Sequence, residues 1–165
     1  MLWLMLGTLV LGFGLVVLRG APYLPTKRRQ IEAAFSLLKL KPGAHIIDLG
    51  SGDGSVLKYA AEHGYRATGY ELNPWLCVIS TLRLWRWRKQ AKVHYGDFWT
   101  KPLPECDGVF VFLIGHFMPK LVTKLEAELK PGTPVVSVAF ELPGYKPERT
   151  KAGVHLYRIK ARGKM

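Results

Sequence analysis

The chain has few cysteines and few acidic residues for its length. Two cysteines in 165 residues, Cys77 and Cys106, exclude the disulfide framework of a small secreted domain, and their spacing matches no zinc motif. We therefore expect two buried free thiols in a reducing compartment and no bound metal. Only 12 acidic residues stand against 24 lysines and arginines, a formal net charge of +12. This excess favours an anionic partner: nucleic acid, phospholipid headgroups or an acidic protein patch.

The first eighteen residues, Met1 to Leu18, carry no charge at all. As a helix this run would extend about 27 Å, close to the hydrocarbon thickness of a bilayer. It lacks the basic start and the small-residue cleavage site of a signal peptide. It also lacks the polar face that a helix of a soluble domain would need. We therefore expect residues 1–20 to form a single transmembrane anchor and residues 21–165 to form one globular domain.

Basic residues lie on the C-terminal side of this run, at Arg19 and over Lys27 to Arg29. Positive charge beside a membrane helix keeps that flank on the inner side. The expected localisation is therefore a single-pass membrane protein with its domain on the cytoplasmic side, or on the matrix side if the membrane is mitochondrial.

Apolar periodicity and turn residues divide the rest of the chain into alternating helices and strands. We expect a helix over residues 31–38, then a strand at 45–49, a helix at 55–63, a strand at 66–71, a helix at 74–89, strands at 93–95 and 108–114, a helix at 119–129, and strands at 134–140 and 154–159. This alternation predicts an α/β fold of the Rossmann-like kind, with a mostly parallel central sheet and helices on both faces.

The sequence Asp48-Leu49-Gly50-Ser51-Gly52-Asp53-Gly54 lies where a buried strand is expected to end and a helix to begin. Glycines there let the backbone turn sharply and approach a ligand beside the positive end of the helix. Two further acids, Glu71 and Asp97, follow the next two strands. Glu71 could accept hydrogen bonds from both hydroxyls of a ribose, and Asp97 with Phe98 is placed to contact an adenine.

Three acids at the ends of three consecutive strands predict a nucleoside pocket. A dinucleotide fold would use G-x-G-x-x-G, whereas here the third glycine, Gly54, follows one residue sooner. Acids beside the glycines favour S-adenosylmethionine, which carries a sulfonium and an ammonium group, over a cofactor with a pyrophosphate. We therefore expect a methyltransferase that uses S-adenosyl-L-methionine.

The stretch Asp48 to Gly54 looks like motif I of the class I methyltransferases. Together with Gly69-Tyr70-Glu71-Leu72-Asn73-Pro74-Trp75-Leu76 and Tyr23-Leu24-Pro25-Thr26, it resembles a small family of membrane-associated protein-lysine methyltransferases. The mitochondrial members of that family modify the adenine nucleotide translocase and the c-subunit of ATP synthase. The resemblance covers roughly Tyr23 to Tyr145. The chain departs from the family pattern at Asp97-Phe98-Trp99-Thr100, where the family continues with a Leu-Trp-Lys-like run.

The resemblance implies methylation of a lysine on a membrane protein, and it implies roles for particular residues. Cofactor-binding roles are implied for Asp48, Gly50, Ser51, Gly52, Asp53, Gly54, Glu71, Asn73, Asp97 and Phe98. A place near the substrate is implied for Tyr23, Pro25 and Thr26.

No catalytic base stands out, because methyl transfer to an amine depends largely on positioning and desolvation. His116, Glu141 and Tyr145 are weak candidates on loops that should border the pocket. The fourth strand lacks the Asn/Asp-Pro-Pro-aromatic sequence found in many methylases of adenine, cytosine or glutamine amides, which argues against those acceptors.

Leu82 to Lys89 interleaves aromatic and basic residues. On a nucleic acid this segment would supply phosphate contacts and stacking faces. With an anchor on the same chain, a basic surface beside the membrane is favoured and nucleic acid is disfavoured. Three alternatives to lysine methylation stay open: methylation of a lipid-phase small molecule, methylation of RNA, and a non-enzymatic S-adenosylmethionine-binding assembly factor.

Overall fold

The computed structural model describes residues 23–160 of the chain. The transmembrane anchor expected at residues 1–20 lies outside this range. Within residues 23–160, no helix has the length and apolar character needed to cross a membrane.

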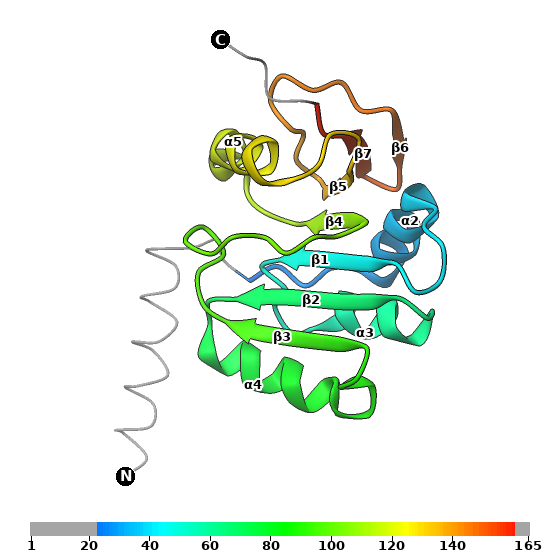
Figure 1. The fold of residues 1–165 in the computed structure, drawn as a ribbon, viewed down its shortest axis with the longest axis vertical. Helices are drawn as coiled ribbons and strands as arrows, with labels where there is room; N and C mark the ends of the chain where they lie inside the picture. Colours follow the sequence, from blue (N-terminus) through cyan, green and yellow to red (C-terminus); the bar gives the residue numbers. More distant parts are fainter. Residues whose placement is uncertain (1–22, 161–165) are drawn as a thin grey trace.

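One seven-stranded sheet forms the centre of the molecule, in the order β3-β2-β1-β4-β5-β7-β6 (Figure 1). The strands are β1 (His45–Leu49), β2 (Arg66–Glu71), β3 (Ala91–Tyr95), β4 (Gly108–Val111), β5 (Pro134–Val138), β6 (Arg149–Lys151) and β7 (Val154–Arg158). β3, β2, β1, β4 and β5 run parallel, while β7 pairs antiparallel with both β5 and β6. The expected mostly parallel sheet of a Rossmann-like fold is confirmed.

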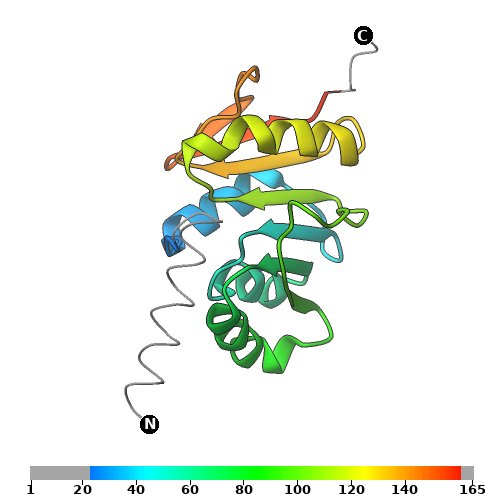
Figure 2. The ribbon, with the colours of Figure 1, turned by 90° about the vertical axis from the view of Figure 1, so that its left-hand side faces the viewer.

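The helices cover both faces of the sheet, as expected. They are α2 (Arg28–Leu38), α3 (Ser55–Glu62), α4 (Pro74–Arg83) and α5 (Met118–Glu128), with short 3-10 helices at Trp85–Trp87 and Gly115–Phe117. The side chains of α2 and α3 form one hydrophobic core with one face of the sheet, and those of α5 form a second core with the other face. Figure 2 shows α5 on the side of the sheet away from α3.

The strand order places a topological switch point at β1. The chain builds outward from β1 through β2 to β3, then returns to add β4 and β5 on the other side of β1. In such sheets the connections on either side of the switch leave a crevice at the carboxyl ends of the strands. This edge of the molecule carries the candidate site.

The predicted helix over residues 74–89 is wrong in its extent, because α4 ends at Arg83. A helix continuing to Lys89 would leave one residue, Gln90, in which to reverse the chain into β3. Instead the backbone tightens, with Trp87 N donating to Leu84 O and Gln90 N donating to Trp87 O, both at 2.8 Å. Leu84 enters the core through this turn.

Smaller expectations also change. The strands expected at 108–114 and 134–140 are shorter, because β4 ends at Val111 and β5 at Val138. β6 was not predicted; it is joined to β7 by a tight turn in which Ala152 and Gly153 both have positive φ angles. Its three residues are all exposed, so they show no alternation that would mark a strand. Cys77 and Cys106 are free, but they are half-buried rather than buried.

Candidate functional site

A pocket lies at the carboxyl ends of β1, β2 and β3, and we call it the strand-end pocket. It is lined by Tyr23, Leu24, Thr26, Asp48, Gly50, Ser51, Gly52, Asp53, Ser55, Val56, Tyr70, Glu71, Leu72, Asn73, Leu76, Asp97, Phe98, Trp99, Phe110, Phe112, Leu113 and Phe117. None of these residues is a lysine, an arginine or a histidine, although the whole chain carries a net charge of +12.

The loop from β1 to α3 forms one wall of the pocket. Gly50 N and Ser51 N both donate to Tyr70 O at 3.0 Å, which fixes the loop against β2. Gly52 has a φ of +52°, and a Cβ at this position would lie 2.7 Å from the Tyr23 ring. Only glycine therefore allows the backbone to turn here while Tyr23 packs directly on it.

Glu71 ends β2 and connects the glycine loop to the start of α4. Its Oε2 accepts a hydrogen bond from Gly52 N and its Oε1 accepts one from Asn73 N, each at 2.7 Å. Burial raises the pKa of Glu71, and these two backbone donors counteract part of that rise. Asn73 in turn caps α4, with its Oδ1 accepting from Trp75 N at 2.9 Å. The carboxylate is thus held rigidly at the pocket wall.

Asp48 is the most unusual side chain of the pocket. It is 2% exposed and belongs to the buried strand β1. Within residues 23–160, Asp48 Oδ2 and Ser51 Oγ are buried without a hydrogen-bond partner. Burial, followed by the charges of Glu71 and Asp53, raises the pKa of Asp48 well above its usual range. A buried carboxyl in this state favours a cationic or hydrogen-bond-donating partner.

Asp53 joins the glycine loop to α4 by an ion pair with Arg83. Its Oδ1 also accepts from Ser55 N at 3.1 Å, at the first turn of α3. Burial would raise the pKa of Asp53, but the bonds from Arg83 and Ser55 leave it below the ordinary value. Asp53 is therefore ionised and already paired, whereas Asp48 has no positively charged neighbour among these contacts.

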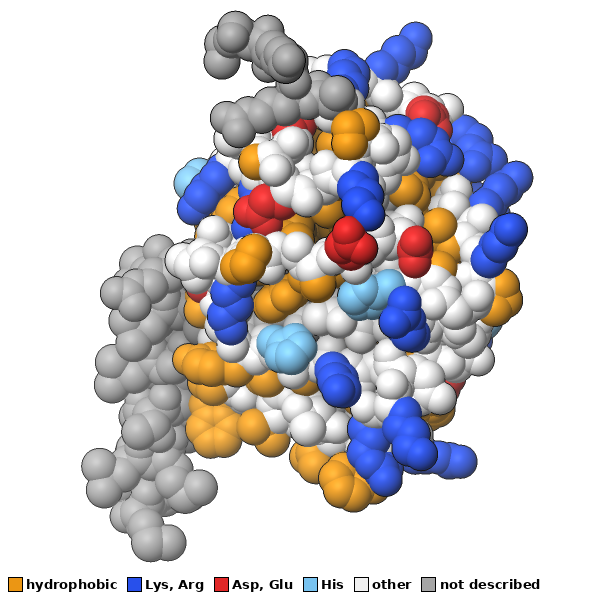
Figure 3. Space-filling model, viewed as in Figure 1, with side chains coloured by type: hydrophobic (Ala, Val, Ile, Leu, Met, Phe, Trp, Pro, Cys, Tyr) orange, Lys and Arg blue, Asp and Glu red, His pale blue; other side chains and the backbone are white. Residues whose placement is uncertain are grey.

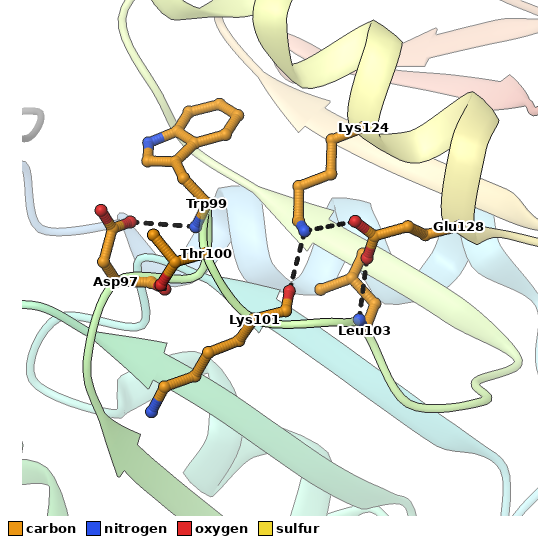
Figure 4. A network of polar contacts seen from close by, with 7 residues as sticks. All are labelled: Asp97, Trp99, Thr100, Lys101, Leu103, Lys124 and Glu128. Atoms are coloured by element: carbon orange, nitrogen blue, oxygen red, sulfur yellow. Dashed lines mark hydrogen bonds and ion pairs between the residues drawn. The ribbon is translucent and has the colours of Figure 1, made fainter.

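The loop after β3 forms the opposite wall. Asp97 Oδ1 accepts from Trp99 N at 2.9 Å, and the ring of Phe98 is 8% exposed. Figure 4 shows how the next residues of this loop are fastened to α5. Lys124 Nζ donates to Lys101 O at 2.8 Å and to Glu128 Oε1 at 2.6 Å, while Glu128 Oε2 accepts from Leu103 N.

The first described residues of the chain, Tyr23 to Thr26, pass over the mouth of the pocket. Tyr23, Leu24 and Thr26 line it, with Tyr23 packed on Gly52 and still 38% exposed. Burial, followed by the nearby carboxylate of Asp53, raises the pKa of Tyr23. A larger molecule approaching the pocket would meet this segment first.

The structure brings most of the predicted site residues together. Of the ten cofactor residues, all except Gly54 line the pocket, and Gly54 instead packs against Ser80 of α4. Of the substrate residues, Tyr23 and Thr26 line it and Pro25 is exposed outside the lining.

The three candidates for a catalytic base do not line the pocket. His116 and Glu141 are exposed. Tyr145 donates its hydroxyl hydrogen to Glu126 Oε1 at 2.8 Å and packs edge-on against Tyr157, so it belongs to the second hydrophobic core. Within residues 23–160, no cluster of three or more histidine, cysteine or acidic side chains could hold a metal ion.

Sequence reasoning missed the apolar wall of the pocket, which consists of Phe112, Leu113, Phe117 and Trp99. Phe112 and Leu113 follow β4, and Phe117 belongs to the short helix before α5. The sequence pattern places Phe112 and Leu113 inside the strand expected at 108–114, whereas β4 ends at Val111. The pocket lining thus combines acidic and aromatic side chains.

These residues fit S-adenosyl-L-methionine. A nucleoside needs an aromatic surface and acceptors for its hydroxyl and amino groups, which Phe98, Glu71 and Asp97 supply. A cationic amino-acid part needs unpaired acceptors in a pocket without basic side chains, which Asp48 supplies. A pyrophosphate would meet four acidic side chains and no basic one in the same place.

Comparisons with known proteins agree with this fit. The family model described as "ANTKMT methyltransferase domain" matches residues 48–149. An adenine nucleotide translocase lysine N-methyltransferase of Mus musculus is 44% identical over 140 residues, which are 82% of this chain and 61% of that protein. A lysine N-methyltransferase of Rattus norvegicus that is named for the c-subunit of ATP synthase is 37% identical over 131 residues, 78% of this chain and 60% of that protein. The chain thus spans about three fifths of the length of these two relatives.

A further relative and a solved structure match over more of their own length. A protein-lysine N-methyltransferase of Saccharolobus islandicus is 31% identical over 131 residues, 77% of this chain and 81% of that protein. The crystal structure of an RNA methyltransferase from Salinibacter ruber in complex with S-adenosyl-L-homocysteine superposes with a TM-score of 0.79 at 27% identity, covering 86% of this chain and 97% of that one.

Proposed function

The chain belongs to the ANTKMT methyltransferase family, and we propose that it transfers a methyl group from S-adenosyl-L-methionine to a lysine side chain of a membrane protein. The observation that carries the cofactor assignment is a pocket lined by four carboxylates and no basic residue in a chain of net charge +12. The lysine acceptor is supported by the relatives named as lysine N-methyltransferases.

Each polar wall of the pocket has a task in holding the cofactor. Glu71, held by Gly52 N and Asn73 N, accepts hydrogen bonds from the ribose hydroxyls. Asp48 and Ser51 face the amino-acid part with their unpartnered oxygens. Asp97 and Phe98 receive the adenine. When bound, the cofactor supplies a methyl group activated by a positively charged sulfur.

The remaining lining residues prepare the acceptor. A lysine amine must be uncharged to attack a methyl group, and an apolar environment lowers the pKa of an amine by desolvation. Phe112, Phe117 and Trp99 form such an environment next to the carboxylates. Tyr23 and Thr26 at the mouth contact the substrate chain and align its lysine. Positioning and exclusion of water then provide most of the acceleration.

The membrane setting is part of the proposal. Met1 to Leu18 is uncharged and about as long, as a helix, as a bilayer is thick. The relatives are named for the adenine nucleotide translocase and for the c-subunit of ATP synthase. An anchored enzyme meets a substrate in the same membrane at a raised effective concentration. We place the catalytic domain on the cytoplasmic face, or on the matrix face of a mitochondrial membrane.

The acceptor class is tested by incubating the protein with methyl-tritiated S-adenosylmethionine and host membranes, soluble protein, RNA and lipid extract. We expect acid-stable label in a membrane protein, mapped by mass spectrometry to lysine. Label in RNA or lipid would overturn the lysine assignment and leave the pocket assignment standing. Cofactor binding without transfer to any fraction would support a non-enzymatic binding protein instead.

A further inference from the structure

Helix α4 has an apolar stripe on its outer face. Trp75, Val78, Ile79 and Leu82 have the i, i+3, i+4, i+7 spacing that normally marks the core-facing side of a helix, yet they are 45%, 53%, 46% and 69% exposed. Trp85, in the turn after the helix, is 64% exposed. A contiguous run of large exposed apolar side chains marks an interaction surface. We call these five residues the α4 stripe.

The packing of α4 on the loop below it fixes this orientation. Leu76, Ser80 and Leu84 face inward, and Leu76 and Ser80 are the only residues of the helix that are buried. Gly54 lies so close to Ser80 that a Cβ there would be 3.0 Å from Ser80 Cβ and 3.2 Å from Ser80 Cα. A rotation that buried the stripe would drive a larger side chain into this contact. The contact between Gly54 and Ser80 therefore keeps the stripe on the outer face of α4.

Positive charge is concentrated at and beyond the C-terminal end of the stripe. The segment from Pro74 to Tyr95 contains Arg83, Arg86, Arg88, Lys89 and Lys92 and no acidic residue. Figure 3 shows apolar side chains along the lower edge of the molecule, over α4, with lysine and arginine side chains gathered beside them. A shallow apolar groove on the same helix, lined by Pro74, Cys77, Val78, Thr81, Leu82 and Tyr95, continues the surface toward β3.

The last turn of α4, which carries Leu82 of the stripe, is connected to the point where the proposed anchor joins the domain. Tyr23 packs on Gly52. Asp53, which follows Gly52 in the chain, pairs with Arg83 in the last turn of α4. From Leu18 to Tyr23 the chain advances five residues, which span at most about 18 Å when fully extended. A membrane that held residues 1–18 would keep Tyr23 within this reach of its surface, and Gly52, Asp53 and Arg83 connect Tyr23 to the last turn of α4.

We propose that the α4 stripe rests in the interfacial region of an anionic lipid bilayer. Tryptophan rings favour this region, the aliphatic residues enter the acyl boundary, and arginine and lysine pair with anionic headgroups. An acidic protein surface would complement the charge but would leave the apolar stripe exposed. The inference extends the proposed membrane setting, because it gives the domain a second contact that orients the strand-end pocket relative to the membrane.

The test uses the full chain in a Cys77→Ser, Cys106→Ser background, with an environment-sensitive fluorophore on either Leu82→Cys or Lys146→Cys. Lys146 is exposed in the loop between β5 and β6, at the far end of the sheet order from α4. Vesicles of phosphatidylcholine and phosphatidylglycerol are then added. We expect a several-fold rise in emission at position 82, a smaller rise with phosphatidylcholine alone, and none at position 146.

Two results would overturn the proposal. Emission at position 82 that stays unchanged while the protein floats with the vesicles would mean that the stripe does not touch lipid. Emission that is high before vesicles are added would mean that the stripe is covered by another part of the chain or by a second copy. Because flotation reports the anchor separately and cofactor binding is measured by calorimetry, failure here is distinguishable from failure of the proposed function.

A charge-reversal pair isolates the electrostatic part. Arg86→Glu with Lys89→Glu should remove most of the extra emission that anionic vesicles produce at position 82. Lys41→Glu with Lys146→Glu reverses two exposed basic residues away from α4 and should leave that emission unchanged. Equal losses of emission in the two double variants would show that net charge alone draws the protein to the vesicles. That result would contradict a specific α4 surface.

Discussion

Individual carboxyl groups of the strand-end pocket differ sharply in their surroundings. Asp53 is paired with Arg83, whereas Asp48 Oδ2 is buried without a partner among the described residues. A carboxyl that is buried and unpaired prefers its protonated form until a cation or donor arrives. Binding of a cationic cofactor should therefore be linked to release of the Asp48 proton.

This linkage predicts how stability depends on pH. Burial raises the pKa of Asp48 in the folded protein, so the ligand-free protein should lose stability as the pH rises through that raised pKa. Asp48→Asn removes the Asp48 contribution and should make the unfolding free energy fall less steeply with pH. A smaller fall should remain, because burial also raises the pKa of Glu71. Urea unfolding at a series of pH values measures the difference.

The same variant should bind S-adenosylmethionine at least about tenfold more weakly, which is about 1.4 kcal/mol. Wild-type affinity should rise with pH, and calorimetry in buffers of different ionisation enthalpy should detect proton release. An affinity that is independent of pH, together with an unchanged stability profile in Asp48→Asn, would show that Asp48 is not the linked group.

The acids of the site could be predicted because each lies at, or within a few residues of, the carboxyl end of a strand with a recognisable apolar pattern. The aromatic wall could not, because Phe112 and Leu113 follow the end of β4 and Phe117 lies in the short 3-10 helix before α5. The Asp53–Arg83 pair joins residues 30 apart in sequence, and nothing in the local pattern of either residue indicates the other. Sequence therefore revealed the charged side of the pocket and not the apolar side.

At the scale of elements, the close packing of the glycine loop on α4 determines how the helix is turned. Gly54 has a φ of +77° and lies against Ser80, whereas Gly132 has a φ of +86° and nothing within 4 Å of its Cβ position. Both glycines have a positive φ angle, but only Gly54 has a neighbouring residue against its Cβ position. They form a matched pair for separating strain from steric contact.

We expect Gly54→Ala to destabilise the protein more than Gly132→Ala. Both changes carry a backbone cost of about 1 kcal/mol. Only Gly54→Ala adds overpacking against α4, so we expect its loss of unfolding free energy to be larger by about 2 kcal/mol. Denaturant unfolding gives both values. Equal losses of unfolding free energy would mean that α4 shifts without resistance, and the argument for a fixed outward stripe would fail.

The central elements follow from hydrophobic pattern and turn residues, and the errors concern where elements end and the edge strand β6. β1, β2 and β5 are buried strands that the sequence predicts directly. β6 has three exposed residues, so its pairing depends on β7 and on the turn between them. The end of α4 depends on where β3 must begin. Both errors concern long-range geometry, which a local pattern does not contain.

At the scale of the whole molecule, charge is segregated. The surface is strongly basic, while the pocket lining contains acids and no bases. This separation allows one domain to bind a cationic cofactor and to face anionic lipid at the same time. The anchor proposed for residues 1–20 would hold these two surfaces beside a membrane substrate.

Deletion of Met1 to Leu18 tests the anchor. The full chain should stay with membranes through a high-salt wash, because hydrophobic insertion is insensitive to salt. The shortened chain should be released by the wash, because only electrostatic and interfacial contacts remain. Sedimentation with washed membranes measures both. A shortened chain that resists the wash would contradict the assignment of the anchor to residues 1–20.

The central claim is that the strand-end pocket binds S-adenosylmethionine through Glu71. Calorimetric titration of the cofactor into wild-type protein and into Glu71→Ala tests it most directly, with circular dichroism and thermal unfolding as controls for folding. We predict measurable binding by the wild type and a loss of at least about 100-fold, or about 2.8 kcal/mol, in a variant that remains folded. A folded Glu71→Ala protein with unchanged affinity would contradict the account.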